Sequence, residues 1–166
     1  METLVSQFDQ TIGKWIGFLE TYPLDRLQRR PADGSWSLGQ VYVHMIDDTR
    51  FFVEQMHAAL SSEEHAEESM TPWAARMFAA GSFPDKRIEG PATHTPIPQP
   101  ESIGDLRAAL TAIQRDVHGI DFSSGRGKAG HPGLGYFSAA EWLQFAEMHL
   151  RHHFRQKERL DVALFQ

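Results

Sequence analysis

The chain has 166 residues and carries 16 Lys and Arg against 22 Asp and Glu, which gives a net charge of −6 with neutral histidines. A chain of this length suits one core, so we expect a single domain over residues 1–166. The negative charge opposes binding to phosphate backbones and anionic headgroups, so we expect neither nucleic acid nor a membrane as partner. The chain has no cysteine, so a metal site would have to use histidine and carboxylate ligands.

The sequence also lacks the features of a targeting segment or a membrane span. The first ten residues have neither a basic start nor an apolar run, and eighteen consecutive apolar residues occur nowhere. A secretory signal and a transmembrane helix are therefore not expected, and the prediction is a soluble cytoplasmic protein.

Apolar residues that recur every three or four positions predict a first long helix over residues 2–22, which Pro23 would end. A second long helix is predicted over residues 38–60. It opens with Ser37 and Gln40, which have the spacing of a capping box, in which each side chain binds the backbone amide of the other residue.

A weaker helical pattern over residues 71–80 is followed by a change of composition. Five of the nine prolines fall within residues 82–101, which predicts an extended connection. A third long helix is predicted from Ser102 to about Val117, and Gly119 would end it.

Six of the thirteen glycines lie within residues 119–135, which predicts a long irregular loop. Ser138 and Glu141 then form another capping box, and the last helix is expected to extend to about Val162. Four long helices, two long connections and almost no alternating strand pattern predict an all-α fold, a four-helix bundle with long crossover loops.

Two histidines of the last predicted helix are expected to face the core. His149 and His153 lie four positions apart on its inward stripe, so both rings can reach one ion. On the second helix, His44 shares an inward face with Asp48. We therefore predict a metal site of three histidines, His44, His149 and His153, with buried histidines in ordinary hydrogen bonds as the alternative.

Three neutral imidazoles would bind a divalent ion and leave at least one position for water or substrate, as in catalytic zinc sites. Such an ion would activate water or a thiol and polarise a carbonyl group. Asp48 and Glu147 are candidates to accept hydrogen bonds from the outer nitrogens of the ligand rings, and a solvated surface charge is the alternative for Glu147.

The sequence resembles a known family in two regions. Residues 131–135 (HPGLG), 138–142 (SAAEW) and 149–156 (HLRHHFRQ) are similar to the C-terminal signature of the DinB-like superfamily, which includes the YfiT-type metal-dependent hydrolases. Residues 36–40 (WSLGQ), which lead into His44, are similar to the first metal-ligand region of that superfamily. The resemblance implies a single DinB-like helical domain over the whole chain.

The resemblance also implies a cofactor and partners. It implies a divalent metal ion, which is zinc, nickel or iron, held by His44, His149 and His153 near one end of the bundle. It further implies a homodimer. Some relatives are thiol transferases that use a low-molecular-weight thiol, and others are mycothiol-dependent isomerases.

Two further residues are candidates for a catalytic role. His131 lies in the glycine-rich loop before the last helix, where it could line the mouth of the site, carry a proton or simply order a turn. Gln156 lies close to the inward stripe of the last helix, where it could bind substrate, a ligand imidazole or a neighbouring helix.

The sequence therefore predicts a metal-dependent enzyme that acts on a small-molecule substrate. It would be a hydrolase that activates water or a thiol S-transferase that activates an external thiol. Peptide hydrolysis is not expected, because no glutamate accompanies the histidines in the His-Glu-x-x-His pattern. A non-catalytic metal- or ligand-binding bundle that acts as a dimeric interaction protein, and haem held by two histidines, are the alternatives.

Overall fold

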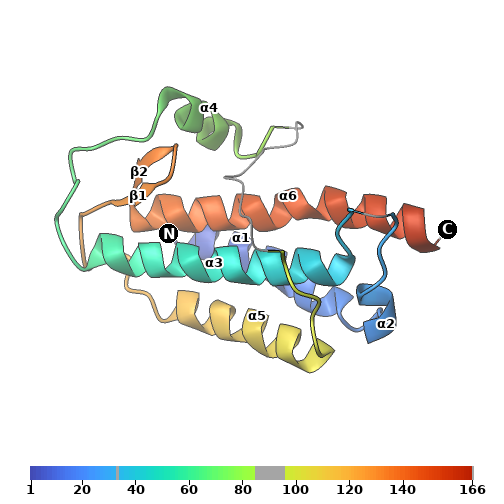
Figure 1. Ribbon diagram of the computed structural model, residues 1–166. Coiled ribbons are helices and arrows are strands. Elements are labelled where there is room, and N and C mark those ends of the chain that lie inside the picture. Colours follow the sequence, from blue (N-terminus) through green and yellow to red (C-terminus); the bar gives the residue numbers. More distant parts are fainter. Residues whose placement is uncertain (33, 85–95, 166) are drawn as a thin grey trace.

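The computed structural model shows a bundle of long helices and describes residues 1–32, 34–84 and 96–165 (Figure 1). In chain order, the elements are α1 (Glu2–Phe18), α2 (Leu24–Leu27), α3 (Leu38–Leu60), α4 (Pro72–Ala80), α5 (Ile103–His118), β1 (Ala129–His131), β2 (Gly135–Phe137) and α6 (Ala139–Phe165).

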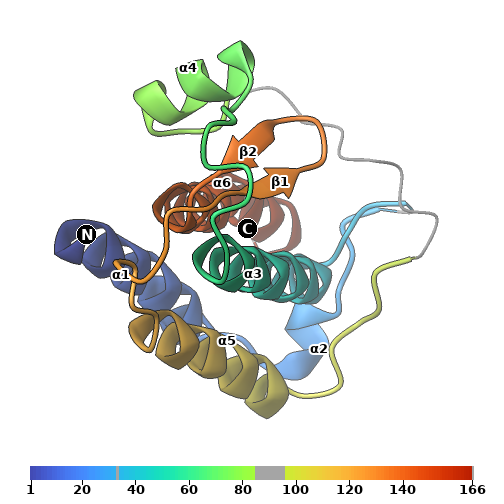
Figure 2. The ribbon, with the colours of Figure 1, turned by 90° about the vertical axis from the view of Figure 1, so that its left-hand side faces the viewer.

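The four long helices are α1, α3, α5 and α6. Helices α3 and α6 pack against each other and run in opposite directions, and α1 and α5 each pack against both neighbours in the bundle (Figure 1). Helices α3 and α5 run in the same direction, so a long crossover has to connect them. Helix α4 and the β1–β2 hairpin lie on the side of the bundle away from α5 (Figure 2).

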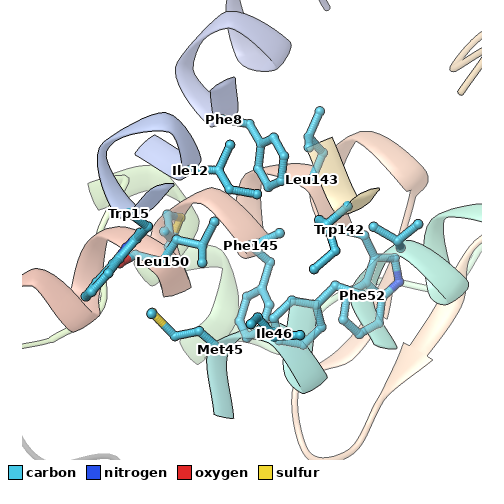
Figure 3. Close-up of a cluster of buried hydrophobic side chains, with 14 of the residues drawn as sticks. Phe8, Ile12, Trp15, Met45, Ile46, Phe52, Trp142, Leu143, Phe145 and Leu150 are labelled. Carbon is cyan, nitrogen blue, oxygen red and sulfur yellow. The ribbon is translucent and has the colours of Figure 1, made fainter. Parts of the chain in front are cut away.

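The core is rich in aromatic side chains, and several of them are drawn in Figure 3. Trp15 of α1 is fully buried, and its indole Nε1 donates a hydrogen bond to the backbone oxygen of Leu150 in α6 at 3.0 Å. The hydroxyl of Tyr42 in α3 donates to the backbone oxygen of Trp15 at 2.8 Å. These bonds satisfy the polar ends of two of the largest core side chains and join three helices at one point.

The helix starts follow the predicted capping residues. Ser37 and Gln40 form both bonds of the capping box at the start of α3, and Ser138 and Glu141 do the same before α6. The side chain of Ser102 accepts a hydrogen bond from the amide of Asp105 at the start of α5. The predicted starts of these three helices are therefore confirmed.

The predicted end of the first helix is wrong by one turn. Helix α1 ends at Phe18 rather than at residue 22, because the next amides bond three residues back instead of four. Pro23 disfavours a helical backbone in the residue before it, so the last turn tightens and the chain restarts in the short helix α2, which the sequence did not predict. At the other end of the chain, α6 extends to Phe165, beyond the predicted Val162.

The glycine-rich segment contains a small hairpin where the sequence predicted only a loop. Strands β1 and β2 pair antiparallel, with His131 opposite Gly135. Gly135 has φ +90°, and a Cβ atom there would lie 2.6 Å from the backbone oxygen of Ser69. The hairpin therefore packs tightly against the segment before α4. Strands of three residues are too short to give a recognisable alternating pattern, so the sequence did not predict the hairpin.

The proline-rich connection is described only in part. Residues 96–100 lead into α5 without helix or strand, which agrees with the predicted extended connection. The part of this connection within residues 85–95, which includes Pro91, lies outside the described residues. Among the helices of the described ranges, none is both long enough and apolar enough to cross a membrane.

Candidate metal centre

His149 and His153 lie one turn apart on the face of α6 that meets α3. Their Nε2 atoms are 3.2 Å apart and their ring centroids 4.6 Å apart. His44 approaches from α3, and its ring centroid lies 5.3 Å from that of His149 and 5.0 Å from that of His153. One ring nitrogen of each histidine lies within 4.8 Å of the other two, so the three imidazoles can share one ion.

Gln156 holds His153 in one orientation. Its Oε1 atom lies 2.8 Å from Nδ1 of His153, so the neutral ring carries its proton on Nδ1 and donates it to the amide oxygen. The lone pair of Nε2 is then directed toward His149. This is the hydrogen bond that a metal-ligating histidine makes with its outer nitrogen.

The pKa values favour uncharged rings. The pKa of His153 is lowered to about 3, mainly by burial and also by the nearby rings of His44 and His152, although the hydrogen bond that it donates to Gln156 opposes them. Burial and the neighbouring imidazoles hold the pKa of His149 well below its usual value. Two of the three candidate ligands are thus neutral at physiological pH and offer lone pairs rather than charges.

Asp48 lies next to the ring nitrogens that face the centre, not next to the outer nitrogen of a ligand ring. Its Oδ2 atom is 3.6 Å from Nε2 of His44 and 3.5 Å from Nε2 of His149. The predicted role as acceptor for an outer nitrogen does not fit this position, because Nε2 is the atom with which His149 faces His153. Burial raises the pKa of Asp48, and the charge of a protonated His44 would lower it.

Glu147 is turned away from the centre, which corrects both roles predicted for it. The side chain is buried and accepts a hydrogen bond from Thr11 of α1 at 2.9 Å. Arg151 binds both of its carboxylate oxygens, at 2.9 and 2.8 Å. Glu147 therefore ties α6 to α1 and is neither a partner of the ligand rings nor a solvated surface charge.

Aromatic rings form the walls of the centre. Trp36 packs on His44 at 5.1 Å between centroids, and Phe52 meets the edge of His149 at 5.5 Å. Phe83, from the connection after α4, lies 6.1 Å from His149. Such apolar walls exclude water and strengthen electrostatic interactions inside the site.

His131 does not join the three histidines through any described contact. Its ring stacks on Trp142 at 5.6 Å and packs against Phe145 at 5.1 Å between centroids. Both partners precede His149 on α6, by one to two turns. The Nδ1 atom of His131 lies 2.9 Å from the backbone oxygen of Pro132, so its described contacts are those of a residue that orders a turn.

Four of the five predicted site residues therefore come together, and His131 lies apart from them. The sequence did not predict that aromatic rings form the walls of the centre. Phe52 lies eight positions after His44, so the helical period already placed it on the same face of α3. Phe83 follows Gly81 in a connection without a regular pattern, so no helical spacing in the sequence could place it near the histidines.

The donor set suits a divalent transition metal. Neutral imidazole binds zinc, nickel and iron, and a carboxylate at the same place is compatible with each of them. Haem does not fit, because centroid distances of 5.0–5.3 Å from His44 to His149 and His153 leave no room for a porphyrin between facing rings.

Comparison with known families identifies the one to which the chain belongs. The family model of the DinB superfamily matches residues 7–156, which is most of the chain and includes all three histidines. No curated protein and no solved structure matches the chain. The match includes α3 and α5 in full and most of α1 and α6, and the chain belongs to the DinB superfamily.

Proposed function

We propose that this protein is a metal-dependent enzyme that acts on a small-molecule substrate. His44, His149 and His153 would hold one divalent ion, which is zinc, nickel or iron. The reaction is either hydrolysis or the transfer of an external low-molecular-weight thiol to an electrophile. The observation that carries the proposal is the convergence of three imidazoles from two helices, with ring nitrogens within 4.8 Å of one another.

A divalent ion at this place would lower the pKa of a water molecule or thiol and polarise a carbonyl group. The protein's own residues would prepare the site for it. Gln156 keeps the lone pair of His153 available, and burial keeps His149 and His153 uncharged. The rings of Trp36, Phe52 and Phe83 would contact an apolar part of the substrate and exclude competing water.

The sulfur of the transferase reaction would have to come from outside, because the chain has no cysteine. Within this proposal the protein works in the cytoplasm as a homodimer. His131 would act on the site through the aromatic cluster of Trp142 and Phe145, against which its ring packs.

A second function is favoured by the burial of the centre. The side chain of His149 is only 12% exposed, and His153 is buried. An ion enclosed in this way could stabilise a bundle that binds a partner or a ligand without catalysis. The two functions differ in whether loss of the ion removes a reaction or only lowers stability.

The experiment that separates them compares wild type with His149→Ala. Each protein is loaded with zinc, nickel or iron and assayed for adduct formation between a low-molecular-weight thiol and a panel of electrophiles, and for hydrolysis of a panel of esters and amides. We expect turnover by wild type and none by His149→Ala. His57→Ala is the matched control, because His57 is an exposed histidine on the same helix as His44. Equal rates in wild type and His149→Ala would rule out the catalytic proposal.

A further inference from the structure

The position of Asp48 relative to the three histidines is not explained by an ordinary hydrogen bond. Its Oδ2 atom lies 3.6 Å from Nε2 of His44 and 3.5 Å from Nε2 of His149. Hydrogen bonds between a ring N–H and a carboxylate are typically about 2.7–3.2 Å long. The carboxylate therefore lies near both nitrogens without being bonded to either of them.

The same distances are those expected between neighbouring ligands of one ion. Ligand atoms about 2.1 Å from an ion, at tetrahedral angles, lie about 3.4 Å from one another. The Nε2 atoms of His149 and His153 are 3.2 Å apart, which is close to this spacing. Oδ2 of Asp48 thus lies at ligand spacing from two of the three histidines.

The helices present these side chains as two matching pairs. His44 and Asp48 are four positions apart on α3, as His149 and His153 are on α6, so each pair occupies one face of its helix. The two helices run antiparallel and pack against each other. Paired ligands from facing helices are the usual way in which bundles build metal centres.

Charge gives a separate reason for a carboxylate here. Three neutral imidazoles leave both charges of a divalent ion uncompensated among aromatic walls, and a charge in an apolar site is costly unless it is paired. Asp48 supplies one negative charge next to the nitrogens. Glu147, the nearby carboxylate of α6, already binds Arg151 and Thr11.

We propose that Asp48 is a fourth protein ligand, so that the centre consists of three histidines and one carboxylate. The inference rests on the proposed metal site and extends it. Four protein ligands fill a tetrahedral zinc site, whereas an ion that takes five or six ligands keeps positions for a substrate. The centre would then keep free positions with nickel or iron, whereas zinc would have to expand to five ligands to take a substrate.

The test is metal affinity, measured on metal-free protein by competition with a chromophoric chelator for Ni²⁺ and Zn²⁺. We expect Asp48→Asn to weaken binding by at least about tenfold, since even the loss of a partner that only supports a ligand costs about 10–100-fold. The matched control is Asp47→Asn. Asp47 is the adjacent carboxylate, is more exposed and lies 3.8 Å from Arg50. We expect this variant to bind like wild type.

A second readout is the visible spectrum of the Co²⁺ form, which reports the number and type of ligands. We expect it to change in Asp48→Asn and to stay unchanged in Asp47→Asn. Thermal unfolding of the metal-free proteins checks the fold, and Asp48→Ser serves as a second variant should the first be unstable. Wild-type affinity and an unaltered spectrum in both Asp48 variants would overturn the inference.

The histidine variants distinguish this failure from failure of the proposed function. If His149→Ala and His153→Ala lose metal binding while the Asp48 variants retain it, the three-histidine site stands and the role of Asp48 is wrong. If the histidine variants also bind like wild type, the proposed metal site itself is wrong.

Discussion

At the scale of single residues, His149 and His153 of α6 are uncharged bases in buried surroundings, where a charge is unfavourable. Burial is the main cause for both, and each ring also disfavours a proton on its neighbours. The hydrogen bond from His153 to Gln156 selects which nitrogen carries the proton. The ability to bind a metal ion and the loss of stability in acid therefore have the same origin, because both depend on imidazoles that the fold keeps neutral.

The first prediction concerns the stability of the metal-free protein in acid. An unfolded histidine has a pKa of about 6.5, and burial lowers the pKa of His153 in the fold to about 3. Between these values the unfolded chain binds a proton that the folded chain does not. The free energy of unfolding therefore falls as the pH falls from about 6.5 toward 3, by about 1.4 kcal/mol per pH unit for each such histidine.

Urea unfolding at several pH values between about 5 and 6.5 measures this slope, in a range where most carboxylates are still ionised. His153→Gln should lose the contribution of one histidine, and His57→Gln should keep the wild-type slope. Equal slopes for all three proteins would show that His153 is protonated in the folded state.

The second prediction concerns Gln156. Replacing it with Leu removes the acceptor for the Nδ1 proton of His153, so the ring loses its fixed tautomer and orientation. We expect Gln156→Leu to weaken Zn²⁺ or Ni²⁺ binding by about 10–100-fold. Gln156→Glu keeps an acceptor oxygen and should bind at least as tightly as wild type. Competition titration measures both, and unchanged affinity in Gln156→Leu would mean that the hydrogen bond does not support the site.

At the scale of the secondary-structure elements, some elements are determined by nearby residues and others by contacts between distant segments. The caps of α3 and α6 act within a few residues, as Ser37 and Ser138 show. The β1–β2 hairpin depends instead on its contact with the segment before α4, where the amide of Thr71 donates to the backbone oxygen of Leu134 at 2.8 Å. Glycine at position 135 makes this approach possible.

The third prediction compares two glycines of the hairpin. Gly133 and Gly135 both have φ +90°, but a Cβ atom at Gly133 would meet nothing within 4 Å, whereas at Gly135 it would lie 2.6 Å from a backbone oxygen. Gly133→Ala should lower the free energy of unfolding by about 1–2 kcal/mol through backbone strain alone. Gly135→Ala should cost about 1–3 kcal/mol more, through overpacking. Similar losses in the two variants, measured by urea unfolding, would show that the close contact is unimportant.

The same division explains what the sequence could predict. Caps and helical spacing revealed the long helices and placed His44, His149 and His153 on inward faces. The hairpin and the wall formed by Phe83 arise from contacts between distant segments, which spacing cannot show. The direction of Asp48 depends on how α3 packs on α6, so the sequence identified the residue but assigned it a different role.

At the scale of the whole molecule, the candidate site depends on how the helices of the bundle pack. Its ligands come from α3 and α6, which lie side by side and antiparallel (Figure 1). One ion would therefore join two helices that are distant in the sequence. Because the unfolded chain does not bring these histidines together, ion binding should favour the folded state.

The fourth prediction follows from this coupling. At a free metal concentration of about 100 times Kd, binding should raise the free energy of unfolding by about 2.7 kcal/mol. For a chain of this size, this corresponds to an increase in Tm of about 5–10 °C. Calorimetry with and without Zn²⁺ measures the shift, which a chelator should reverse. An equal shift in His149→Ala would place the stabilising ion elsewhere.

The most direct test of the three-histidine centre is the metal content of protein purified without a histidine tag. Elemental analysis of wild type should find about one transition-metal ion per chain, after incubation with zinc, nickel or iron and gel filtration. The variants His44→Ala, His149→Ala and His153→Ala should each retain little or none, and His57→Ala should match wild type. Wild type that retains no metal, or histidine variants that retain as much as wild type, would show that the three imidazoles do not hold an ion.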